Sequence, residues 1–286
     1  MTSTIAVYSL YMSDAIQHLQ PWDLPLPDVC GYQLTADWCQ SEAELEQLST
    51  QLLYLLGPRE RALWQALPQR FHRRREWLGG RLAAKWAVMQ QLEMQPARPL
   101  MQGSRLEGRS PTSFEILPDT LGRPVVHSRY QGLDPPLATV SISHLRGGRI
   151  LAAAAPAGHQ IGIDITTVGR VRVEDIISLA FTEQDLAALP SPLTDSGYLA
   201  LWAAKEAAAK AAGTGLQGRP TAWQATAYRR STHEPFCCID IRHLDSPYQG
   251  PPFSVLVWHE MGHDVVNEAG NDLGDDIVAL CHVAQP

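Results

Sequence analysis

Trp202-Ala-Ala-Lys205-Glu206-Ala-Ala-Ala-Lys210-Ala-Ala-Gly213 is the stretch that most constrains the fold, because its composition predicts an alanine-rich helix that ends at a glycine. Residues 202, 206 and 210 are four apart and therefore share one face of this helix. Upstream, Ile161-Gly162-Ile163-Asp164-Ile165 is an apolar run of strand type with a single carboxylate in it. Burying that carboxylate is costly unless a cation or hydrogen bonds compensate its charge.

Together the two stretches supply the residue types of a metal-assisted phosphate site. One carboxylate from a strand, Asp164, and one from a helix, Glu206, can jointly bind a hard divalent cation through oxygen. Lys205 and Lys210 flank Glu206 and could bind phosphate, and they are two of only three lysines in the chain. The pattern indicates magnesium-assisted phosphoryl chemistry. The alternative is an ordinary surface ion pair between Glu206 and Lys210, worth roughly 0.2 to 0.5 kcal/mol.

The composition is that of a globular protein with a sizeable core, since 45% of the 286 residues are hydrophobic and 19% are charged. The formal net charge of −7 argues against a general nucleic-acid binder. Eight basic residues nevertheless fall between positions 59 and 85, which predicts a local positive patch for an anionic ligand or partner, or else a solvated helix face. They are Arg59, Arg61, Arg70, Arg73, Arg74, Arg75, Arg81 and Lys85.

The cysteines and the apolar stretches bear on the cellular setting. Five cysteines, an odd number without CxxC spacing, argue for a reducing compartment and against a disulfide framework. The first residues lack the features of a secretory signal, and the longest apolar stretch, Ile150 to Ala155, is far shorter than the ~20 residues that span a bilayer. We therefore expect a soluble, cytoplasmic protein with neither a membrane nor a nucleic-acid partner.

The order of expected elements is helices followed by strands in each half, without regular βαβ alternation, which predicts an α+β fold. The segment Pro156-Ala-Gly-His159 marks a boundary between an N-terminal lobe, residues 1–158, and a C-terminal lobe, residues 159–286. No tandem repeat is apparent. Strands are expected at 5–12, 139–142, 149–155, 161–165, 236–241, 253–258 and 276–283, and helices at 42–56, 59–67, 73–92, 173–180, 183–189 and 199–212.

Five motifs in order give the chain a family resemblance. Gly162-Ile-Asp164 and the Lys205-Glu206 helix resemble the paired signature of the surfactin-type 4′-phosphopantetheinyl transferases. Gly122-Arg123-Pro124 and Ser141-Ile-Ser143-His144 resemble two shorter motifs of the same family. The segment from Arg75 to Arg81 lies where the family has a basic helix, so the resemblance covers most of residues 57–216.

The resemblance implies a fold and a reaction. Two similar lobes, related by a pseudo-two-fold axis, would hold the active site in the cleft between them, in a protein that acts as a monomer. Coenzyme A and Mg²⁺, or Mn²⁺ in its place, would bind there. A serine hydroxyl of an apo acyl or peptidyl carrier protein would attack the β-phosphorus of coenzyme A, and adenosine 3′,5′-bisphosphate would leave.

The family's functional residues transfer to matching positions of this sequence. Asp164 and Glu206 would bind the metal. Glu206, Asp185 and Lys210 would be catalytic, with the proton of the incoming serine taken up by Glu206, Asp185 or a metal-bound water. The residues expected to bind coenzyme A are Arg75, Arg123, Ser143, His144, Lys205 and Lys210.

Two positions depart from the family pattern. Thr166 stands where many members have a second acid, and a hydroxyl is a weaker magnesium ligand. Asp185 stands where the family often has a glutamate that is proposed as general base. These departures leave open a second reading, a family member that binds coenzyme A or a carrier protein without transferring the group.

A third reading comes from His259-Glu260-Met-Gly-His263, which matches the His-Glu-x-x-His pattern of zinc proteases. That chemistry needs both histidines on one face of a helix, a third ligand, and Glu260 as base. The preceding residues 253–258 have strand propensity and Gly262 weakens a helix, so the pattern favours a strand end followed by a turn.

Overall fold

Two antiparallel sheets, one in each of two units of the chain, contain every strand of the described residues. Unit 1 comprises residues 1–158 and unit 2 comprises residues 159–286. The structure is a computed structural model that describes residues 18–94, 110–129, 137–169, 172–230, 236–245, 251–260 and 275–284. The strand expected at 5–12 lies outside these residues.

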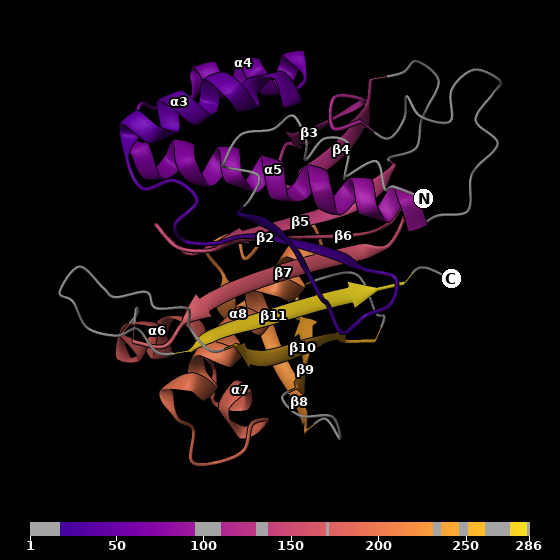
Figure 1. Cartoon of the computed structure of the whole chain (residues 1–286). Helices are drawn as coiled ribbons and strands as arrows, with labels where there is room; N and C mark the ends of the chain where they lie inside the picture. Colours follow the sequence, from indigo (N-terminus) through magenta and orange to yellow (C-terminus); the bar gives the residue numbers. More distant parts are fainter. Residues whose placement is uncertain are drawn as a thin grey trace. The chain divides into compact units, whose positions relative to one another are not determined.

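The described part of unit 1 is a helical layer on a six-stranded sheet (Figure 1). Its elements are β1 (Leu19–Trp22), β2 (Cys30–Leu34), α3 (Glu42–Leu52), the 3-10 turn η1 (Leu53–Leu55), α4 (Pro58–Ala66), α5 (Phe71–Met94), β3 (Phe114–Pro118), β4 (Pro124–Ser128), β5 (Ala138–His144) and β6 (Ile150–Pro156). The sheet order is β1-β2-β6-β5-β4-β3. The long helix α5 packs on β2, β5 and β6, and α3 and α4 lie on its outer side.

Unit 2 repeats this design on a smaller scale. Its described elements are β7 (Gln160–Thr167), α6 (Val173–Ala180), α7 (Glu183–Ala187), α8 (Asp195–Ala211), the 3-10 turn η3 (Pro220–Ala222), β8 (Trp223–Arg230), β9 (Cys237–His243), β10 (Phe253–Glu260) and β11 (Asp276–Val283). The sheet order is β7-β11-β10-β9-β8, and α8 packs on β7, β11 and β10. Among the described residues, no helix is both long and apolar enough to cross a membrane.

The two units share one topology. Among the described residues, from β2 in unit 1 and from β7 in unit 2, the chain forms one strand, two short helices, one long helix and four strands. The order β2-β6-β5-β4-β3 in unit 1 corresponds to β7-β11-β10-β9-β8 in unit 2, and β1 is an addition to unit 1. The two antiparallel sheets with packed helices confirm the α+β prediction. The family resemblance implied two similar lobes, although the sequence shows no tandem repeat, because the two long helices share little beyond Ala-Ala-Lys, at positions 83–85 in α5 and 203–205 in α8.

The long helix of unit 2 begins earlier than its alanine-rich pattern predicts. Thr194 is the N-cap, and its side-chain oxygen accepts a hydrogen bond from the backbone N of Gly197 at 3.3 Å, so α8 starts at Asp195 rather than near Leu199. The predicted end is confirmed, since Gly213 follows the last turn with a φ of 79°. The strands β1, β2 and β8 were not predicted, and the bounds of β3 and β4 were not predicted either.

Helix α8 lies close to β7 because Gly162 has no side chain. A Cβ atom added to Gly162 would lie 1.9 Å from the carbonyl oxygen of Ala207 and 2.5 Å from the backbone N of Ala211. Gly162 and Asp164 are two residues apart on the strand, so their side-chain directions point to the same face. The glycine therefore brings the helix directly over the face of β7 that carries Asp164.

We predict that Gly162→Ala lowers the free energy of unfolding by about 3 kcal/mol, because the backbone of α8 must move away to admit the methyl group. Gly197→Ala is the matched control, since it lies on α8 and its added methyl would meet only the end of the Leu193 side chain, at 3.0 Å. Denaturant unfolding of both variants tests this. Equal stability of the two would show that α8 and β7 are not held at this separation.

Candidate functional site

Asp164 and Lys210 form an ion pair that joins β7 to α8. The Nζ of Lys210 lies 2.7 Å from Oδ1 of Asp164 and donates a second hydrogen bond to the carbonyl oxygen of Ile163 at 3.0 Å. The Asp164 side chain is 11% exposed and that of Lys210 is 27% exposed. The carboxylate is thus mostly shielded from water, while part of the lysine side chain reaches solvent.

Glu206 lies one helical turn before Lys210 on α8 and belongs to the same electrostatic group. Burial raises the pKa of Glu206 above its usual value, the positive charge of Lys210 opposes this rise, and the negative charge of Asp164 adds to it. The structure therefore brings Asp164, Glu206 and Lys210 together in unit 2. Lys210 is a cation that both carboxylates share.

This donor set fits a magnesium ion. Mg²⁺ binds to proteins through one or two carboxylates and completes its octahedral shell with waters and substrate phosphates. A divalent cation would neutralise the carboxylate pair more fully than the lysine alone. In the described ranges, this site included, no three histidine, cysteine or acidic side chains gather to hold a metal, so the protein groups offered to an ion here are the two carboxylates.

Lys205 has a different environment from the one expected of a phosphate ligand. Its side chain is 0% exposed, and its Nζ donates to the carbonyl oxygens of Ala180 at 2.8 Å and Pro220 at 3.3 Å and to Oδ2 of Asp185 at 2.8 Å. An ammonium group with three N–H donors has no further donor for a ligand. This corrects the assignment of Lys205 to coenzyme A binding.

The same contacts correct the catalytic assignment of Asp185. Its carboxylate is 0% exposed and, besides Lys205, accepts hydrogen bonds from the backbone N and Oγ1 of Thr182 and from the backbone N of Ala225. A sealed carboxylate with every oxygen engaged cannot reach an incoming hydroxyl. Of the three candidates for the proton acceptor, Glu206 and a metal-bound water remain.

In unit 1, His144 lines a basic pocket. It ends β5, is exposed, and its Nδ1 lies 3.7 Å from Oε2 of Glu76 on α5. The pocket has a volume of about 450 Å³. Its lining residues are Arg70, Phe71, His72, Arg73, Glu76, His144 and Arg146. Three arginines around one carboxylate give the pocket a positive character suited to an anionic ligand.

The other expected coenzyme A residues of unit 1 do not line this pocket. Arg75 is 1% exposed and donates to the carbonyl oxygens of Cys39 at 2.7 Å, Gly148 at 3.1 Å and Ala36 at 2.6 Å. This corrects its assignment, because such a guanidinium holds the fold. Ser143 is buried in β5, and Arg123 lies exposed in the β3–β4 turn, where its Nε is 3.2 Å from Oδ2 of Asp119.

Sequence reasoning missed Arg70, Arg73 and Arg146 as individual pocket residues. Arg70 and Arg73 belong to the basic cluster of residues 59–85. Arg70 directly precedes α5 and Arg73 lies on its exposed face, and this exposure distinguishes them from the buried Arg75 and Lys85. Arg146 lies two residues after His144, in the turn that joins β5 to β6. Proximity to His144 is therefore the signal that could have identified it.

The zinc-protease pattern is not on a helix. His259 and Glu260 end strand β10, and Oε1 of Glu260 accepts a hydrogen bond from Nε1 of Trp258 at 2.8 Å. Neighbouring strand residues point to opposite faces of a sheet, which does not produce the arrangement that this metal site needs. His263 lies outside the described residues.

Comparison with known proteins agrees with the geometry of unit 2. Residues 160–249 match the family model of the 4′-phosphopantetheinyl transferase superfamily. This part of the chain, which contains Asp164, Glu206 and Lys210, is therefore a domain of that superfamily, and the match does not distinguish the surfactin type from other members. No curated protein matches the chain.

We predict that Arg75→Met lowers the free energy of unfolding by about 3 kcal/mol, because three buried carbonyl groups lose a charged donor. Coenzyme A affinity of the folded variant should stay within about twofold of the wild type, since the Arg75 side chain is 1% exposed and does not reach a ligand at the surface. Thermal unfolding and calorimetric titration with coenzyme A measure the two quantities. A stable variant with much weaker coenzyme A binding would restore Arg75 to the site.

Proposed function

We propose that the protein is a magnesium-dependent 4′-phosphopantetheinyl transferase. It transfers phosphopantetheine from coenzyme A to a serine of an apo acyl or peptidyl carrier protein and releases adenosine 3′,5′-bisphosphate. One observation carries this proposal: the segment that matches the superfamily is also the segment in which Asp164, Glu206 and Lys210 converge.

Asp164 and Glu206 are the residues that would hold the magnesium ion. When bound, the ion supplies positive charge to the diphosphate of coenzyme A, where negative charge accumulates during phosphoryl transfer. Lys210 supplies a second cation beside it. Because the Lys210 side chain is partly exposed, its ammonium can turn from the Asp164 carboxylate to a phosphate oxygen.

Glu206 is also suited to take the proton of the attacking serine. In the ion-free protein, burial and the charge of Asp164 both raise the pKa of Glu206, and a bound magnesium ion would lower it again. We therefore assign the proton to Glu206 because of where its carboxylate lies, beside Asp164 and Lys210, and not because of that shift.

The pocket of unit 1 supports the recognition of a highly anionic substrate. Arg70, Arg73 and Arg146 carry permanent positive charge, and His144 adds a donor beside them. A phosphate monoester such as the 3′-phosphate of coenzyme A is the kind of group that arginine recognises best, through paired hydrogen bonds. The charge of this pocket, taken by itself, therefore suits a phosphate monoester.

We predict that Asp164→Asn and Glu206→Gln each reduce transfer by at least about a thousandfold, because each removes a charged ligand for the magnesium ion. Incubation of each variant with apo carrier protein, coenzyme A and Mg²⁺ measures this, with mass spectrometry detecting the added phosphopantetheine. Glu183→Gln, which alters an exposed acid in the same unit, is the matched control and should transfer normally.

Two outcomes would contradict this assignment. Full turnover by either site variant would remove that carboxylate from the metal site. No mass gain with the wild-type protein across carriers of fatty acid, polyketide and nonribosomal peptide pathways would favour a protein that binds coenzyme A or a carrier without transfer.

We further predict that Lys210→Ala raises the KM for coenzyme A by about 10- to 100-fold, the usual effect of losing a charged hydrogen-bond donor. Initial-rate kinetics at varied coenzyme A concentration test this. Arg219→Ala removes an exposed cation of the same unit that pairs with Asp245, and it serves as the control. An unchanged KM in Lys210→Ala would show that this lysine binds only Asp164.

A further inference from the structure

Each unit contains one fully buried lysine on its long helix, paired with an acid on the preceding short helix. In unit 1, Nζ of Lys85 lies 2.9 Å from Oε2 of Glu60, and in unit 2, Nζ of Lys205 lies 2.8 Å from Oδ2 of Asp185. All four side chains are 0% exposed. We call these pairs the unit 1 clamp, Glu60 and Lys85, and the unit 2 clamp, Asp185 and Lys205.

The acids of the two clamps occupy equivalent positions and bind equivalent groups. Each is the third residue of its short helix and accepts a hydrogen bond from the backbone N of the residue before that helix, at 2.8 Å for Glu60 and 2.7 Å for Asp185. The second oxygen of each acid accepts from the strand that follows the long helix, from Ile116 N at 3.0 Å and from Ala225 N at 2.7 Å. Each clamp thus joins three elements.

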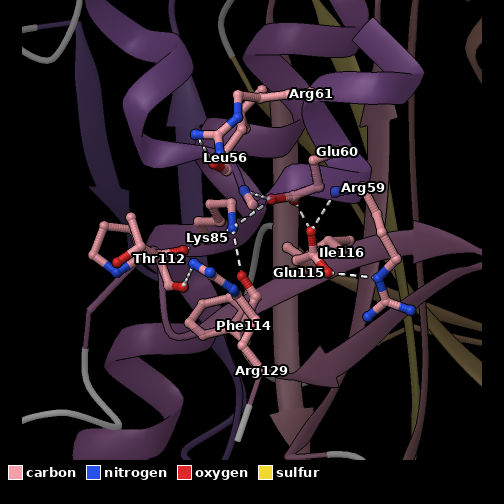
Figure 2. A network of polar contacts seen from close by, with 12 residues as sticks. Leu56, Arg59, Glu60, Arg61, Lys85, Thr112, Phe114, Glu115, Ile116 and Arg129 are labelled. Atoms are coloured by element: carbon pink, nitrogen blue, oxygen red, sulfur yellow. Dashed lines mark hydrogen bonds and ion pairs between the residues drawn. The ribbon is translucent and has the colours of Figure 1, made fainter.

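The lysines are matched as well. Lys85 donates to the carbonyl oxygens of Pro111 at 2.7 Å and Phe114 at 2.8 Å, just as Lys205 donates to two carbonyl oxygens in unit 2. Each ammonium also lies over a phenylalanine ring, at 4.8 Å from Phe114 and 5.3 Å from Phe181. Figure 2 shows the unit 1 clamp with Lys85 pointing at Glu60 and at the Phe114 carbonyl.

The two clamps differ in the residues that follow their lysines in the sequence. Lys205 is followed by Glu206 and, one turn later, by Lys210, the residues that form the candidate site. The corresponding positions after Lys85 are Trp86 and Gln90. The unit 1 clamp therefore supports no carboxylate–lysine pair on its own helix.

The two long helices also differ in how firmly apolar contacts fix them. The buried side chains of α5 include Leu78, Leu82, Trp86, Val88 and Met89, which interlock with their surroundings. The buried residues of α8 include Leu199 and Leu201, but from position 203 to position 211 they are alanines apart from Lys205. Methyl groups resist rotation of a helix about its axis less than large side chains do, so a polar contact must define the rotation of α8.

We propose that Lys205 is a positioning residue, which sets the rotation of α8 so that Glu206 and Lys210 face Asp164. The activity part of this inference rests on the proposed function. Lys85 performs the same structural task in unit 1, on a part of α5 beyond the pocket residues of that helix, the last of which is Glu76, and without a carboxylate–lysine pair beside it. An error of about 1 Å in the placement of a reacting group can cost on the order of a hundredfold in rate. The unit 2 clamp can therefore change the rate strongly through the positions of Glu206 and Lys210, although it does not contact the substrate.

The test compares Lys205→Met with Lys85→Met, which remove equivalent ammonium groups. Both variants should show similarly lowered melting temperatures. At a temperature where both are folded, Lys205→Met should lose at least about tenfold in kcat and need at least about tenfold more Mg²⁺ for half-maximal rate. Lys85→Met should retain both values within about twofold, and Lys205→Arg should recover part of the loss.

Equal kinetic effects of the two variants, or normal Mg²⁺ dependence in Lys205→Met, would overturn the proposal. Should a methionine variant not fold, Lys205→Met/Asp185→Asn and Lys85→Met/Glu60→Gln replace the pair, because they leave no unpaired buried charge. Titration of each variant with Mn²⁺ by electron paramagnetic resonance needs no turnover. If the wild type fails to transfer but binds Mn²⁺, the positioning role is supported when Lys205→Met binds Mn²⁺ more weakly and Lys85→Met does not. Absence of Mn²⁺ binding by the wild type overturns the proposal.

Discussion

The close packing of α8 on β7 is the constraint on which the candidate site depends. Gly162 leaves no side chain between strand and helix, so the backbone of α8 at Ala207 and Ala211 comes directly over the strand. Two residues further along the same face, Asp164 meets Lys210 at 2.7 Å, and its charge acts on Glu206. A larger residue at position 162 would separate the groups whose proximity gives them their chemistry.

The two units share one topology and one buried polar connection, but they carry different residues on their long helices. In both units a buried lysine, an acid that caps a short helix, and the strand after the long helix form the same polar connection. Around this common frame, unit 2 places charged residues on its long helix where unit 1 has Trp86 and Gln90. A burial cost of several kcal/mol for each ion explains why such a clamp must be fully hydrogen-bonded in both places.

The sequence predicted most of unit 2 because its elements have strong local signals. The strand with Asp164, the alanine-rich helix and the strand at 276–283 all follow from periodicity and composition. The sequence did not distinguish Lys205 from Lys210, because both are lysines on one helix, and only the packing of α6, α7 and η3 encloses the first. Arg75 was misassigned for the same reason, since the carbonyl groups that bind it lie on segments distant in sequence.

The account stands on the claim that Asp164 and Glu206 bind one divalent cation beside the diphosphate of coenzyme A. Anomalous diffraction from crystals grown with Mn²⁺ and coenzyme A tests it most directly. We predict a single strong anomalous peak in unit 2, within bonding distance of both carboxylates and of the diphosphate. A peak bound to only one of them or at another place, or coenzyme A bound with no peak near these residues, would contradict the account.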